Sequence, residues 1–460
     1  MVVSYLPHTP AEREEMLRAI GVPSVEDLFA NIPEHLRGTL PIPDALSEME
    51  TLQLVQALAA ENLNLAGRPA FLGAGAYRHY IPAAVPAITG RSEFYTAYTP
   101  YQPELSQGTL QVIYEYQSMI AELTGLDVAN ASLYDAATGV TEACTIAINA
   151  TGRSTIATVG GLNPQYARVL RTYLHQEGFN LLEIPEEWVL DPEQVAAALD
   201  ESVAGLVVQS PNLFGSIEPM ADLAAAAHDA GALFIAVSNP LSLAILAPPG
   251  DVGADVAVGC GQPFGIPLQY GGPYLGIIAA RAGLARQLPG RICGATVDGE
   301  GRRGYVLTLQ AREQHIRREK ATSNICTNHQ LMALAATVYL SLLGKQGLPE
   351  LATLCAQKAH YAARRIAAIP GFALASDAPF VNEFTVRTPV PAAEVNRYLL
   401  RREIIGGFDL GRVDPALQNY LVLAFTELNT RQQIDDLVST LESLQPEVAV
   451  EALQSAGGVA

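Results

Sequence analysis

Residues 231–261 read GALFIAVSNPLSLAILAPPGDVGADVAVGCG, and the pattern of this stretch decides the fold class. Two short runs, Leu233–Val237 and Asp255–Gly259, have the length and the β-branched content of buried strands. The preceding Met220–Ala230 has the spacing of an amphipathic helix, and Gly231 follows it where helix ends favour a left-handed residue. This alternation of helix and strand predicts a largely parallel sheet that helices cover on both faces.

The same alternation extends outward over residues 71–334. Four further runs predict strands at Ser154–Val159, Asn180–Ile184, Gly205–Gln209 and Tyr274–Ala279, and Asn163–Gln176 predicts a helix between two of them. We therefore expect an α/β protein built on one large, mostly parallel sheet.

Four segments are expected along the chain: a helical N-terminal arm (1–70), a large α/β domain (71–334), a small C-terminal α/β domain (335–446) and a flexible tail (447–460). The arm carries two capping boxes, Thr9-Pro10-Ala11-Glu12 and Ser47-Glu48-Met49-Glu50. Its apolar stripe is too small to form a core alone, which favours wrapping around a neighbouring domain or subunit.

The small domain follows from its own pattern. Helical spacing predicts helices at Met332–Leu343, Leu351–Ala368 and Pro391–Arg402, with a last helix after a capping box at Thr430, and apolar runs predict strands at Phe380–Arg387 and Tyr420–Phe425.

The composition excludes several classes of protein. With 460 residues, 49% hydrophobic and 16% charged, the chain is expected to be globular with a sizeable core. Its net charge of −19 opposes binding to nucleic acids and to anionic membrane surfaces. The five cysteines are widely spread without a CxxC pair, so we expect neither a disulfide framework nor a metal site. No signal peptide or membrane helix is indicated, and we expect a cytoplasmic protein.

A tyrosine-rich segment, Ser92–Gly108, is the most unusual part of the sequence. It presents Tyr95, Tyr98 and Tyr101 between prolines, after which Ser106 is expected to cap a helix. The segment fits an active-site or interface loop, and it fits equally well a loop packed over the sheet.

Two further segments leave similar alternatives open. The glycine-rich Gly259–Gly276 permits close approach of a ligand to the backbone, but it also fits a plain turn between strands. Glu319–Asn328 contains Lys320 and Asn324 and fits either a cleft or subunit contact, or a solvated hinge. Lysine occurs only at positions 320, 345 and 358, so no side chain before Lys320 can form a Schiff base.

Four stretches together resemble the glycine decarboxylase family, the P-protein of the glycine cleavage system, in the first of its two subunits. They are FYTAYTPYQPELSQG (94–108), LTGLDVANASLYD (123–135), PPGDVGADVAVGCGQPFGIPLQYGGPYLG (248–276) and REKATSNICTN (318–328). The resemblance implies fold type I of pyridoxal-phosphate (PLP) enzymes, with a mostly parallel seven-stranded sheet in the large domain and a smaller C-terminal domain. In the catalytic half of that family, a lysine forms a Schiff base with PLP and an aspartate keeps the pyridine nitrogen protonated.

This chain departs from the catalytic pattern at three places. Gln262 stands in the segment where the lysine would fall, and Asn239 stands where the aspartate would fall. The phosphate-holding serine-glycine turn is replaced by Asp135-Ala136-Ala137-Thr138, whose carboxylate would repel a phosphate. We therefore expect no catalytic, cofactor-binding or covalently PLP-bound residue in this chain.

The resemblance implies the lysine-free subunit of a glycine dehydrogenase (decarboxylating), inactive alone. A lysine-bearing second subunit would hold PLP, decarboxylate glycine and pass the aminomethyl group to the lipoyl arm of the H-protein, in a heterotetramer with two copies of each subunit. The residues expected at the partner interface or the active-site entrance are Tyr95, Tyr98, Tyr101, Ser106, Lys320 and Asn324. Two alternatives are a self-sufficient PLP aminotransferase or decarboxylase that uses Lys320, and a non-catalytic scaffold.

Overall fold

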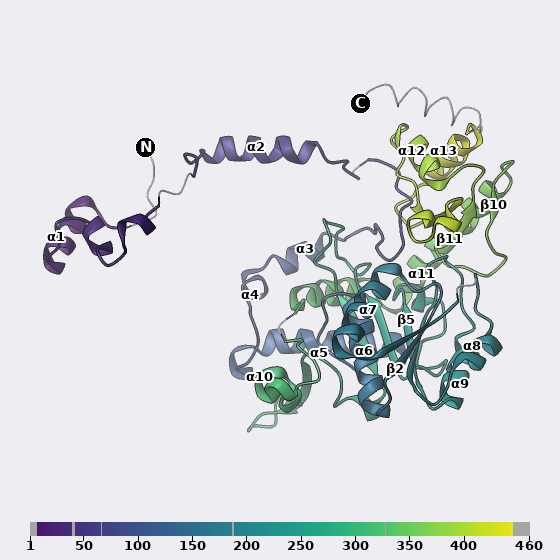
Figure 1. The fold of residues 1–460 in the computed structure, drawn as a ribbon, viewed down its shortest axis with the longest axis horizontal. Helices are drawn as coiled ribbons and strands as arrows, with labels where there is room; N and C mark the ends of the chain where they lie inside the picture. Colours follow the sequence, from purple (N-terminus) through teal and green to yellow (C-terminus); the bar gives the residue numbers. More distant parts are fainter. Residues whose placement is uncertain (1–6, 39–41, 66, 186–187, 327, 445–460) are drawn as a thin grey trace. The chain divides into compact units, whose positions relative to one another are not determined.

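The computed structural model describes residues 7–38, 42–65, 67–185, 188–326 and 328–444 (Figure 1). The chain divides into two compact units between Asn64 and Leu65. The predicted tail, 447–460, lies outside the described residues.

The N-terminal unit is helical, with α1 (Pro10–Ile20), α2 (Glu48–Ala60) and two short 3₁₀ turns, Glu26–Phe29 and Glu34–Leu36. Both predicted capping boxes are present. The hydroxyl oxygens of Thr9 and Ser47 each accept the N–H of the glutamate at the third helical position, and their own backbone N–H groups donate to the carboxylate of that glutamate. Among the described residues of this unit, neither α-helix buries a side chain.

The second unit is built on the expected sheet, which has seven strands within the described residues in the order β1-β7-β6-β5-β4-β2-β3. Strands β2 to β6 pair in parallel with one another, whereas β7 is antiparallel to both β6 and β1. The strands are β1 (Val128–Ala129), β2 (Thr155–Val159), β3 (Asn180–Ile184), β4 (Val203–Gln209), β5 (Leu233–Ser238), β6 (Val256–Cys260) and β7 (Gly276–Ala280). The mostly parallel seven-stranded sheet is thus confirmed.

Helices cover both faces of this sheet because alternate strand residues point to opposite sides. The pair Ile235 and Val256 faces α6 (Ala136–Thr151) and α7 (Pro164–Glu177). The next pair, Ala236 and Ala257, faces the other side. That side is covered by α5 (Gln107–Thr124), α8 (Pro192–Ala198), α9 (Met220–Asp229) and the first part of α11 (Gln330–Ala367).

A hairpin that the sequence pattern did not predict packs on α5; it consists of β8 (Ile292–Val297) and β9 (Arg303–Thr308). Short helices α3 (Ala84–Thr89), α4 (Ser92–Tyr95) and α10 (Gln314–Arg317) complete this region.

Helix α11 contains both predicted helical stretches in one element. They join at Gly344, whose φ of 59° and ψ of −169° are not helical. By length and composition alone the helix could cross a membrane, but 33% of its most apolar window is buried in the protein. Ala336 and Tyr339 of this helix pack in the core beneath the sheet, whereas Leu342 and Leu354 are exposed.

The small sheet is antiparallel in the order β10-β11-β13-β12, with β10 (Ala373–Leu374), β11 (Glu383–Arg387), β12 (Phe408–Asp409) and β13 (Tyr420–Ala424). It packs on the second half of α11, on α12 (Ala392–Leu400) and on α13 (Arg431–Glu442), which begins at the predicted capping box. Residues 69–80, here called the strap, add to this sheet: Phe71 donates its N–H to Ile405 and accepts from Ala424. The strap therefore belongs to the small-domain core before it reaches the large sheet.

Candidate functional site

A small pocket lies outside the carboxyl ends of β4, β5 and β6, where open α/β sheets bind ligands. Its volume is about 30 Å³, room for about two water molecules, whereas ligand sites typically span about 300–1,000 Å³. Tyr77, Tyr166, Asn239 and Glu383 are among the side chains that line it. In the described structure these side chains narrow the pocket to well below the size of a typical ligand site.

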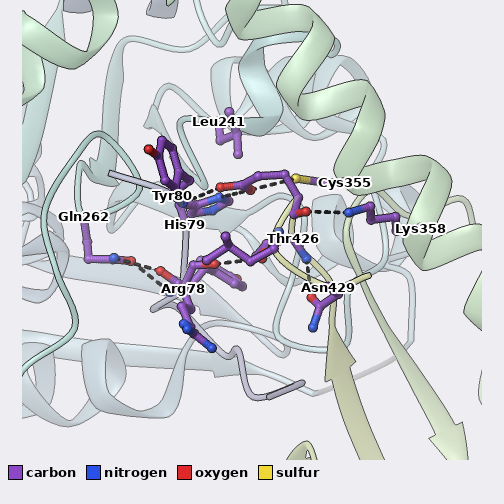
Figure 2. Close-up of polar contacts among 12 residues, drawn as sticks. Arg78, His79, Tyr80, Leu241, Gln262, Cys355, Lys358, Thr426 and Asn429 are labelled. Atoms are coloured by element: carbon purple, nitrogen blue, oxygen red, sulfur yellow. Dashed lines mark hydrogen bonds and ion pairs between the residues drawn. The ribbon is translucent and has the colours of Figure 1, made fainter. Parts of the chain in front are cut away.

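Gln262 follows β6 and is 1% exposed. Its Oε1 accepts the N–H of Tyr77 at 2.8 Å, and its Nε2 donates to the carbonyls of Tyr77 at 2.8 Å and of Ile266 at 2.9 Å. Figure 2 shows this side chain directed at the strap. The residue in the predicted lysine segment is thus engaged in joining the strap to the large sheet.

Asn239 follows β5 and makes a local turn. Its Oδ1 accepts the N–H of Leu241 at 3.1 Å. The side chain is neutral and therefore cannot supply the negative charge that keeps a pyridinium protonated.

Asp135 caps the N-terminus of α6. Its Oδ1 accepts the N–H of Thr138 at 2.8 Å, so the carboxylate takes up part of the helix end that a phosphate would need. All three departures noted in the sequence therefore have structural roles of their own.

A buried carboxyl and phenol close the pocket, and the sequence analysis missed both. Glu383 accepts from Ala74 N at 2.6 Å and from the Tyr77 hydroxyl at 2.7 Å. Burial raises the pKa of Glu383 to about 7, and burial, followed by the nearby Glu383 charge, raises the pKa of Tyr77 well above its usual value. No local pattern marks this pair, because the contact joins residues 306 apart in the sequence. A Cβ on Gly73 would lie 2.3 Å from Glu383 Oε1, so the close approach of the strap requires a glycine there.

The three tyrosines predicted at the interface are all exposed to solvent. Tyr95 and Tyr98 are 68% and 75% exposed, and Tyr101 is 51% exposed. The Tyr101 hydroxyl accepts from Arg291 Nη2 at 2.8 Å, and Arg291 Nη1 donates to the carbonyl of Cys326. Arg291 thereby joins the tyrosine segment to the 318–328 segment, a link that sequence reasoning did not find.

The other predicted residues lie apart from the pocket. Lys320, in a 3₁₀ turn, and Asn324 are both exposed, and neither lines the pocket as described. Ser106 occupies the N-cap position of α5, but the predicted capping hydrogen bond is wrong: its side chain makes none to the described helix end. Its ψ of 22° departs from the extended backbone that aims a capping hydroxyl at the helix.

Comparison with known proteins places this geometry in context. Residues 3–441 match the family described as the glycine cleavage system P-protein. A relative from Thermomicrobium roseum, named probable glycine dehydrogenase (decarboxylating) subunit 1, is 53% identical over 441 residues, covering 95% of this chain and 98% of the relative.

Solved structures agree with this match. A crystal structure of glycine decarboxylase (P-protein) of the glycine cleavage system, in inhibitor-bound form, has a TM-score of 0.87 and 45% identity over 96% of this chain and 99% of that chain. A C-DES mutant with glycine covalently linked to its PLP cofactor has a TM-score of 0.61 at 14% identity, over 83% of this chain and 98% of that chain. The fold is therefore that of fold type I PLP enzymes.

Proposed function

Because the chain belongs to the glycine cleavage system P-protein family, as a glycine dehydrogenase (decarboxylating) subunit, we propose that it is the lysine-free half of a two-subunit enzyme. In this proposal the chain supplies no reacting group. It stabilises a second, lysine-bearing subunit and forms part of the entrance to that subunit's active site.

The observation that carries the proposal is that the side chain of Gln262 is fully hydrogen-bonded within this chain. All three hydrogen bonds of its side chain go to backbone groups of this chain, beside a cavity of about 30 Å³. An amide cannot condense with an aldehyde, and the space admits about two water molecules. The residues present here do not fit PLP, which supports its assignment to the partner.

The alternative that uses Lys320 finds no comparable support. That side chain is exposed and does not belong to the lining of the pocket at the strand ends, within the described residues. Fold type I alone does not make a catalyst, because function depends on the site rather than on the fold.

The surface around Arg291 supports the partner role. Exposed Tyr95 and Tyr98 precede Tyr101, which Arg291 ties to the segment after Lys320. Exposed aromatic side chains are typical of protein interfaces. We assign this surface, with Ser106, Lys320 and Asn324, to contact with the second subunit or to the entrance of its active site.

The remaining parts of the proposal concern the assembly. Two copies of each subunit would form a heterotetramer that acts on glycine and delivers the aminomethyl group to the lipoyl H-protein. We place it in the cytoplasm. The five cysteines, all within the described residues, are free, as is usual for thiols in a reducing compartment.

Co-expression with the second subunit tests the proposal. The complex is expected to contain one PLP per second subunit and none on this chain, and glycine-dependent CO₂ exchange should require both subunits together with H-protein. This chain alone, incubated with PLP, should stay colourless. Borohydride reduction and peptide mapping that placed PLP on Lys320 would refute the proposal.

A further inference from the structure

Three side chains that lie far apart in the sequence meet in the interior of the second unit. They are His79 in the strap, Cys355 on α11 and Glu427 in the loop after β13. One donor atom from each lies within 4.8 Å of the other two. Figure 2 shows His79 and Cys355 directed toward the same place between the strap and α11.

The cluster is well shielded from water. Cys355 is 0% exposed, and the side chains of His79 and Glu427 are 1% and 12% exposed. His79 Nδ1 is the ring nitrogen that faces Glu427 Oε2, at 2.7 Å, whereas Nε2 on the other side of the ring is buried without a hydrogen-bond partner among the described residues.

We propose that His79, Cys355 and Glu427 bind one Zn²⁺ ion, with a water molecule as the fourth ligand. A nitrogen, a sulfur and a carboxylate oxygen form the mixed donor set that suits zinc. One thiolate and one carboxylate would balance the charge of the ion. This inference is independent of the proposed function.

The distances are close to those that the ion requires. In a zinc tetrahedron, the usual ligand distances place sulfur and oxygen about 3.5 Å apart, and nitrogen and oxygen about 3.3 Å apart. Cys355 Sγ lies 3.7 Å from Glu427 Oε2, and His79 Nδ1 lies 2.7 Å from the same oxygen. The first pair fits, and a rotation of the carboxylate that widens the second by about 0.6 Å would bring it to the zinc value. The donor atoms of His79 and Cys355 lie within 4.8 Å of each other, against about 3.6 Å in a zinc tetrahedron, so this pair would close by up to about 1.2 Å.

Neighbouring groups hold these ligands in place. The N–H of Tyr80 donates to Glu427 Oε1, which leaves Oε2 directed at His79 and Cys355. Lys358 donates to the backbone carbonyl of Glu427, so its ammonium fixes the loop rather than occupying the carboxylate. Such hydrogen bonds around a metal orient its ligands.

Bound zinc would fasten the strap to the small domain. His79 is two residues from Tyr77, whose backbone Gln262 binds, so the two attachments hold the strap at both the small domain and the large sheet.

The test uses the full-length chain, freed of metal with a chelator and re-equilibrated with ZnCl₂. Elemental analysis should give one zinc per chain, and the variants His79→Asn, Cys355→Ser and Glu427→Gln should each weaken binding by at least about tenfold. Cys293→Ser is the matched control, because Cys293 is also a buried thiol that donates to an oxygen, and it should bind zinc like the unsubstituted chain.

A second measurement needs no variant. Replacing zinc with Co²⁺ should give a thiolate-to-cobalt charge-transfer band in the unsubstituted chain and in Cys293→Ser. The proposal is overturned if that band is missing, or if Cys355→Ser retains zinc as strongly as the unsubstituted chain.

Discussion

Replacing Gln262 with alanine should destabilise the second unit strongly. The substitution leaves three buried backbone groups without their partner: the N–H and carbonyl of Tyr77 and the carbonyl of Ile266. An unsatisfied buried group costs about 1–3 kcal/mol, and water admitted to the enlarged cavity would recover part of this. We expect the free energy of unfolding to fall by about 3 kcal/mol.

Urea unfolding of the purified chain measures this change. The single tryptophan, Trp188, packs against Phe214 and Tyr420, so its fluorescence reports on the second unit. Hydrogen exchange of the Tyr77 amide, which Gln262 accepts, should also accelerate in the variant.

The control is Gln111→Ala. Within the described residues, the side chain of this exposed glutamine bonds only to a neighbouring glutamate on α5, so its removal should change stability by less than about 0.5 kcal/mol. If Gln262→Ala stayed equally close to the unsubstituted chain, the structural role assigned to Gln262 would be wrong. Gln262→Lys should also be destabilised, since an ammonium cannot accept the Tyr77 N–H, and it should remain colourless with PLP.

Three further substitutions test other parts of the structure. The pKa of Glu383 is about 7 in the folded state against an ordinary 4.5, so the native state binds its proton more tightly and should lose up to about 3 kcal/mol of stability as the pH rises from 4.5 through 7. Glu383→Gln should flatten that decline when urea unfolding is measured as a function of pH. An unchanged decline would contradict the assignment. Gly73→Ala should lower stability by about 2 kcal/mol, because its Cβ would lie 2.3 Å from Glu383 Oε1; a melting temperature equal to that of the unsubstituted chain would count against this packing. Tyr98→Ala should leave stability within about 0.5 kcal/mol but weaken binding to the second subunit, measured by calorimetry, by about tenfold or more. Tyr173→Ala, at another exposed tyrosine, is the control; if both variants bound the second subunit equally well, Tyr98 would not belong to the interface.

The glycine-rich segment shows how far local reasoning reached. The sequence left Gly259–Gly276 open as a ligand-binding segment or a plain turn. The structure places Gln262 of this segment on the strap, 185 residues away in sequence. Deciding between these two interpretations required knowing that Gln262 contacts the strap, which no local sequence pattern could show.

The amino-acid sequence by itself determined the parts of the fold that short-range physics controls. Hydrophobic periodicity located strands β2 to β7 within about two residues, and the Thr9, Ser47 and Thr430 capping boxes formed as predicted, because a cap needs only four consecutive residues. The sequence also shows directly that no lysine precedes residue 320, since this requires no knowledge of the fold.

Only the tertiary structure decided what fills the space at the ends of the strands. The pairing of Tyr77 with Glu383 spans 306 residues, and that of His79 with Glu427 spans 348. Such contacts arise when the strap crosses from the small sheet to the large one. Burial then fixes which polar groups must satisfy one another, a condition that exists only after the domains have packed.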